Sequence, residues 1–74
     1  MASIDEATMR KMAMLDRLLK QYDDEQKNLY GHYRTAYNLG NAELRGSIAK
    51  QIEALMKKRQ EALDKLHKIA MTIK

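Results

Sequence analysis

The side chains whose types and spacing best suit chemistry are Asp64 and His67, three residues apart in the second half of the chain. On a helix this spacing places a carboxylate and an imidazole on one face, an arrangement that helical metal sites use in pairs. One such pair supplies too few ligands for a metal ion, and the sequence has no second pair. We therefore interpret Asp64 and His67 as polar surface residues, and His32 as a solvated histidine.

The sequence lacks the common catalytic motifs. It has no Ser-His-Asp set, no glycine-rich phosphate loop and no pair of acids placed on a concave scaffold. It also has no cysteine, which excludes thiolate chemistry and disulfides and fits a reducing compartment. We expect a protein that is not an enzyme and that takes no metal and no cofactor.

The densest basic run is Lys57-Lys58-Arg59. Residues 41–74 contain eight basic and four acidic side chains, a net charge of +4, whereas residues 1–40 are neutral. Glu53, Glu61 and Asp64 interrupt the run, although a face that tracks phosphates is usually free of acids. A solvated helix face is the favoured interpretation, and contact with nucleic acid through Lys57, Lys58 and Arg59 is the alternative.

Two predicted helices position these side chains. The second, over residues 42–73, has the clearer helical pattern in the sequence. Its inward positions are separated alternately by four and three residues, which is typical of a helix that packs along another helix. A single arginine interrupts them. The positions are Ile48, Ile52, Leu55, Arg59, Ala62, Leu66, Ile69 and Ile73.

The first helix is predicted over residues 4–38, with Ser3 and Glu6 as a capping box at its start. Its inward positions follow the same alternation. Gly31 interrupts this helix and costs about 1 kcal/mol relative to alanine, so a bend there is a prediction left open. The inward positions are Met12, Leu15, Leu19, Tyr22, Gln26, Leu29, Tyr33 and Ala36.

Residues 39–41, Leu39-Gly40-Asn41, are predicted to form the turn between the helices. Gly40 is able to adopt the left-handed conformation that ends a helix, and Asn41 is able to cap the next one. Because short connections make antiparallel neighbours, we predict an all-α fold, an antiparallel two-helix hairpin that resembles a coiled coil and forms a single domain over residues 1–74.

Folding the chain at Gly40 predicts which residues meet. Tyr22 is placed opposite Arg59, which suggests a guanidinium over a tyrosine ring. Gln26 finds no polar partner in this register. Near the turn, Tyr30, Tyr33 and Tyr37 face small residues of the second helix, and we interpret the three rings mainly as core.

A second column of apolar residues runs beside the inward face of the second helix at seven-residue spacing. We call it the outer stripe, and it consists of Ala49, Met56, Leu63 and Ala70. The first helix covers it only in part, and exposed apolar strips of this kind mark interfaces. We predict that the outer stripe, helped by Leu18 and Met14, binds a second copy of the chain or a helical protein partner. Six methionines suit such an adaptable surface.

The sequence contains no run of about 18 apolar residues, so we expect no membrane span. Its first residues are acidic where a signal peptide would be basic and then apolar, and we expect a cytoplasmic protein.

A chain of 74 residues without cysteine, with two helices about a glycine-containing turn and an apolar stripe, resembles the small co-chaperones of type III secretion needle subunits. The resemblance implies that the hairpin binds a tetratricopeptide-type partner, and that the pair keeps the needle subunit soluble in the cytoplasm before export. The stretch Tyr30-Gly31-His32-Tyr33 and the basic second helix depart from the family pattern. The alternative function is that of a homodimeric, hairpin-shaped RNA-binding regulator.

Overall fold

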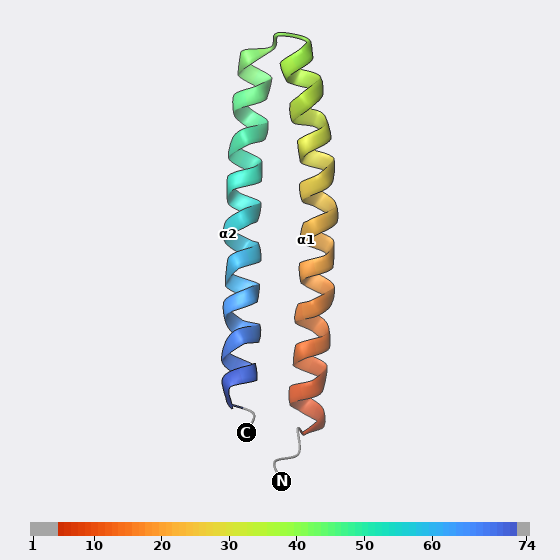
Figure 1. The fold of residues 1–74 in the computed structure, drawn as a ribbon, viewed down its shortest axis with the longest axis vertical. Helices are drawn as coiled ribbons and strands as arrows, with labels where there is room; N and C mark the ends of the chain where they lie inside the picture. The colour runs from red at the N-terminus through yellow and green to blue at the C-terminus, as the bar shows by residue number, and fades with distance from the viewer. Residues whose placement is uncertain (1–4, 73–74) are drawn as a thin grey trace.

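The computed structural model describes residues 5–72, which form two long α-helices and one tight turn. Helix α1 covers Glu6–Asn38 and helix α2 covers Ala42–Thr72. The helices lie side by side in opposite directions, so α1 begins and α2 ends at the same end of the rod (Figure 1). The molecule measures 59 × 15 × 13 Å. This confirms the predicted all-α antiparallel hairpin.

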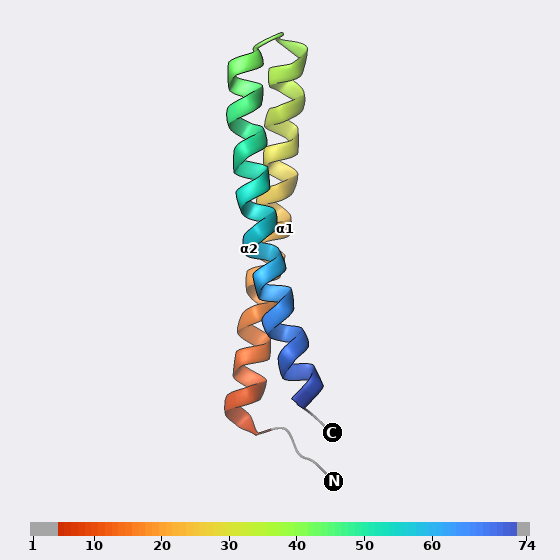
Figure 2. The ribbon, with the colours of Figure 1, turned by 90° about the vertical axis from the view of Figure 1, so that its left-hand side faces the viewer.

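The residues buried between the helices lie at the predicted inward positions. In α1 they are Leu15 and Ala36, and in α2 they are Ile48, Ile52, Leu55 and Ala62. The inward positions between them in α1, among them Leu19, Tyr22 and Leu29, are half-buried. The helices cross at a shallow angle in the side view, as the alternation of threes and fours requires (Figure 2). Ile73 lies outside the described residues.

The turn reverses the chain, and its residues form hydrogen bonds with the end of α1 and with the start of α2. Gly40 has a φ of 70°, in the left-handed region, where a side chain would cost roughly 1–2 kcal/mol. The N–H groups of Gly40 and Asn41 donate to the carbonyl oxygens of Tyr37 and Ala36, each at 3.0 Å. The Oδ1 atom of Asn41 then accepts from the N–H of Leu44 at 3.0 Å. Gly40 therefore ends α1 and Asn41 caps α2, as predicted.

Asp5, and not Ser3, caps the start of α1. The Oδ1 atom of Asp5 accepts from the N–H of Thr8 at 2.7 Å. This bonding to Thr8 lowers the pKa of Asp5, so the cap stabilises the helix fully above the pKa of the unfolded chain, and this contribution is lost as the pH falls through the lowered pKa of the folded state. Glu6 forms an ion pair with Arg10 at 3.5 Å. The predicted capping box is wrong because the helix begins at Glu6, and Ser3 lies outside the described residues.

Gly31 leaves α1 uninterrupted. The helix continues through it to Asn38. The hydroxyl of Thr35 donates to the carbonyl oxygen of Gly31 at 3.1 Å, so this carbonyl has a second partner near the glycine.

Replacing Gly31 by alanine is expected to stabilise the hairpin. A Cβ atom at this position would meet nothing within 4 Å. Alanine loses less backbone entropy on folding, so Gly31→Ala should raise the free energy of unfolding by about 1 kcal/mol in urea titrations. Gly40→Ala is the control of opposite sign, because the positive φ strains alanine. A loss of stability in Gly31→Ala would contradict a regular helix at this position.

The prediction that three tyrosines are core holds only for Tyr33. This ring packs against the buried cluster of Ala36, Ile48 and Ile52, together with Leu29. By contrast, Tyr30 is 49% exposed and Tyr37 is 61% exposed. These two rings lie one residue beyond inward positions, so they point to the flank of the hairpin and not between the helices.

The two exposed rings have polar partners instead. The Nε2 atom of Gln26 donates to the hydroxyl oxygen of Tyr30 at 3.0 Å, which supplies the partner that the predicted register lacked. The guanidinium of Arg45 lies 5.4 Å from the centre of the Tyr37 ring. Such a cation–π contact contributes about 0.5–1 kcal/mol at an exposed site.

Candidate protein interaction surfaces

The outer stripe lies along one flank of α2 and is largely open to solvent. Met56 is 52% exposed, and Ala49 and Ala70 are also exposed. Leu63 is half-buried. The helix period keeps four residues at this spacing on one side, so the predicted stripe lies along one side of α2.

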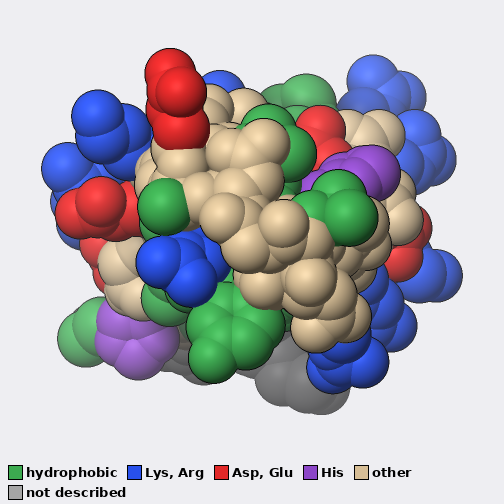
Figure 3. Space-filling view, turned by 90° about the horizontal axis from the view of Figure 1, so that it is seen from above, with side chains coloured by type: hydrophobic (Ala, Val, Ile, Leu, Met, Phe, Trp, Pro, Cys, Tyr) green, Lys and Arg blue, Asp and Glu red, His purple; other side chains and the backbone are tan. Residues whose placement is uncertain are grey.

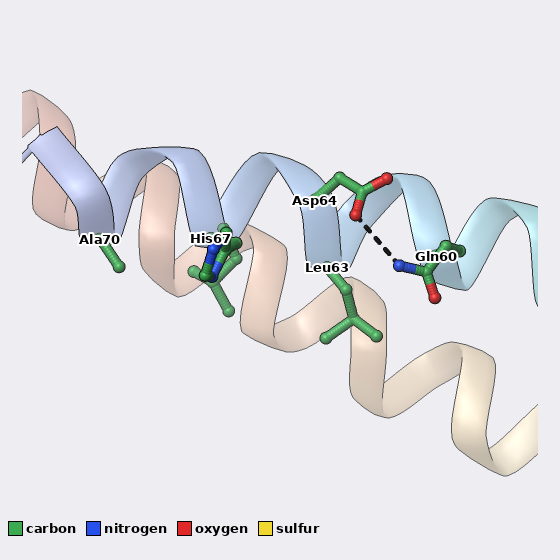
Figure 4. Close-up of a pocket in the computed structure, with 6 residues that line it drawn as sticks. Gln60, Leu63, Asp64, His67 and Ala70 are labelled. Carbon is green, nitrogen blue, oxygen red and sulfur yellow. Dashed lines mark hydrogen bonds between the residues drawn. The ribbon is translucent and has the colours of Figure 1, made fainter.

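Leu63 and Ala70 line a shallow hollow of about 430 Å³ together with Leu66 and His67. Figure 4 shows Leu63 and Ala70 pointing to one side of α2, with Asp64 and Gln60 also at the hollow. The Nε2 atom of Gln60 donates to Oδ1 of Asp64 at 3.0 Å. Asp64 and His67 are both exposed. No group of three metal-ligating side chains occurs in residues 5–72.

Helix α1 contributes apolar side chains to the same flank, which the sequence interpretation missed. Each stripe residue directly follows an inward position of α2, for example Met56 after Leu55. The two helices of an antiparallel pair are related by an approximate two-fold axis, so residues that follow inward positions lie on the same flank in both. In α1 these include Tyr30 and Tyr37 near the turn, and Asp16 and Asp23 nearer the start of the helix. Spacing from the buried Ala36 is the signal that would have found them.

Met14 and Leu18 do not belong with the outer stripe. They line a second hollow with Lys65 and Ile69. Lys65 is two residues from Leu63, and residues two apart point to different sides of a helix. The prediction that Met14 and Leu18 help the stripe is therefore wrong, because they lie across the opposite flank of the hairpin.

The three residues of the basic run Lys57-Lys58-Arg59 have different environments in the structure. Lys57 and Lys58 are exposed, whereas Arg59 is half-buried and its Nε donates to Oδ1 of Asp23 at 2.8 Å. The predicted contact of Arg59 with Tyr22 is replaced by this ion pair, since a carboxylate is a stronger acceptor than a ring face. Both side chains are partly exposed, 40% and 50%, so the pair contributes at most about 1 kcal/mol.

The surface at the turn mixes charge types. Seen from above the turn, apolar side chains lie among basic and acidic ones (Figure 3). Leu39 is 73% exposed and Leu44 is 45% exposed there. No single sign of charge covers this end, so it offers no obvious electrostatic recognition.

No protein-family model matches the chain, and neither a curated protein nor a solved structure matches it. Within residues 5–72, neither helix has an apolar stretch of the length that a membrane crossing requires.

Proposed function

We propose that the hairpin is a protein–protein interaction module and that a second copy of the chain covers its outer stripe, giving an antiparallel four-helix bundle. The observation that carries this proposal is the exposure of Met56, 52%, in the middle of α2 and beside the half-buried Leu63. A two-helix hairpin has no third layer to cover this flank. Burying both side chains would contribute a few kcal/mol at about 25 cal/mol per Å².

The stripe is complementary to itself. In an antiparallel pair of α2 helices centred between Met56 and Leu63, Met56 meets Leu63 of the second copy. Ala49 then meets Ala70 of the second copy. Large side chains thus meet at the centre and alanines meet on either side, and the same surface serves both copies, which supports a symmetric interface.

The type III secretion resemblance keeps the interaction module but gives the stripe a different partner. The stripe would then bind the groove of a tetratricopeptide-type partner, and the pair would hold a needle subunit in the cytoplasm. The hairpin and its open stripe support this form. RNA binding is not carried further, because Asp23 holds Arg59 and leaves only two lysines of the basic run exposed.

Substituting Leu63 is expected to abolish association. Sedimentation equilibrium of the whole chain at micromolar concentration should show a dimer, and Leu63→Glu should be a monomer of unchanged helicity, because a charge would be buried in the interface. Gln51→Glu is the matched control, with the same charge change on the other flank, and it should still dimerise.

Three results would count against the second copy. A well-folded wild-type monomer means that the hairpin needs no cover on its outer stripe. Equal association of Leu63→Glu and wild type places the interface elsewhere. A poorly helical chain that aggregates loosely means that the stripe requires a different protein, as the co-chaperone form expects.

A further inference from the structure

A second hollow lies at the open end of the hairpin, on the flank opposite the outer stripe. Its volume is about 440 Å³. Apolar side chains from both helices form its floor. They are Leu15, which is 5% exposed, and Leu18 and Ile69, which are half-buried. Met14 also lines the hollow but is 56% exposed, so only the other three side chains form a floor between α1 and α2.

Three lysines form the rim of this hollow: Lys11 from α1, and Lys65 and Lys68 from α2. All three are exposed, and no carboxylate lines the hollow. The two ion pairs found in residues 5–72 join Arg10 to Glu6 and Arg59 to Asp23, so neither uses a lysine of the rim. An apolar floor thus lies between three lysines that form no ion pair within residues 5–72.

We propose that this lysine-rimmed hollow binds an acidic amphipathic helix of another protein. Apolar residues of that helix would enter between Leu18 and Ile69, and its carboxylates would meet Lys11 and Lys65. Helices that dock in grooves use this combination of apolar anchors and flanking charges. Complementary charge would also raise the rate of association and select against basic partners.

Charge and shape favour this occupant over two others. A second copy bound symmetrically through this flank would bring its lysines against those of the first, which is repulsive. A membrane surface is flat and binds protruding apolar side chains, whereas Leu15 in the floor of this hollow is 5% exposed and lies between two helices. The site is on a different flank from the outer stripe and stands whether or not the chain forms a dimer.

The test uses the full chain and a designed probe, a capped helical peptide of about 18 residues with leucine on one face and glutamate on the others. Fluorescence anisotropy of the labelled peptide should show saturable binding. The variant Lys65→Glu/Lys68→Glu should weaken binding at least about tenfold. The matched control Lys50→Glu/Lys57→Glu carries the same charge change at exposed positions away from the hollow, and should weaken it less than about threefold.

Circular dichroism verifies that each variant stays helical. If Lys65→Glu/Lys68→Glu unfolds, the neutral variant Lys65→Gln/Lys68→Gln takes its place in the test. Equal binding of a peptide with lysine in place of glutamate would overturn the proposal. So would an equal loss in the control variant, or no binding at all. Binding to vesicles with anionic lipid but not to the peptide would assign the hollow to a membrane surface and would also overturn it.

Discussion

Leu55→Ala should lower the free energy of unfolding by about 2–4 kcal/mol, a large share of the stability of so small a domain. Leu55 is 5% exposed and lies near the middle of α2. Its side chain packs along the single apolar layer between the helices. Removing three of its carbon atoms leaves a cavity that two long helices cannot close without losing contacts elsewhere.

Urea titration followed by circular dichroism measures this effect, with the protein concentration held constant because association would add to the apparent stability. Leu44→Ala is the control, since it deletes the same atoms at a position that is 45% exposed. We expect a change below about 1 kcal/mol there. Equal losses in the two variants would mean that Leu55 is not part of the core.

Ala36→Leu should destabilise the hairpin by overpacking it. Ala36 is 0% exposed, and Ile48 and Ile52 pack around it. A larger side chain must push α1 away from α2 close to the turn, where the connection is too short to absorb the shift. The expected cost is about 1–3 kcal/mol.

Thermal unfolding is the measurement for Ala36→Leu, because a loss of 1 kcal/mol lowers the Tm of a domain of this size by about 4–8 °C. The control is Ala54→Leu at an exposed position of α2. It should change stability by less than about 0.5 kcal/mol. An unchanged Tm in Ala36→Leu would show that the helices separate near the turn at little cost.

Periodicity was sufficient to predict most of this fold. The alternation of threes and fours selected Leu15, Ile48 and Ile52 as inward residues, and all three are buried. Gly40 and Asn41 marked the turn because few residue types suit a left-handed helix end followed by a cap. These signals are local, so they do not depend on how the two helices pack.

The errors concern side chains at the margin of the apolar layer. The side chains of Tyr37 and Arg59 are long enough to reach several partners. Helix spacing does not indicate whether a contact with an aromatic ring or one with a carboxylate is the more stable. Arg59 reaches Asp23, one residue beyond the expected Tyr22. Leu18 was assigned to the wrong flank because apolar character alone does not distinguish the two sides of an inward face.

The candidate surfaces were predicted only in part for a related reason. The spacing of Ala49, Met56, Leu63 and Ala70 predicts an apolar stripe, but spacing along one helix does not identify what binds to it. The lysine-rimmed hollow needs residues from both ends of the chain, such as Lys11 and Lys68. Their proximity follows from the register of the folded hairpin and not from either helix alone.

The tight turn at Gly40 and Asn41 also sets an order of assembly. Contacts beside it join residues close in sequence, such as Ala36 and Ile48, whereas the open end brings together residues far apart in sequence, such as Leu15 and Ile69, which line one hollow. The entropy lost in closing a loop grows with its length, so we expect folding to begin at the turn and to proceed toward the termini. The lysine-rimmed hollow is then the last part to form and the first to open. A ligand bound there would hold together the end of the hairpin that chain connectivity leaves weakest.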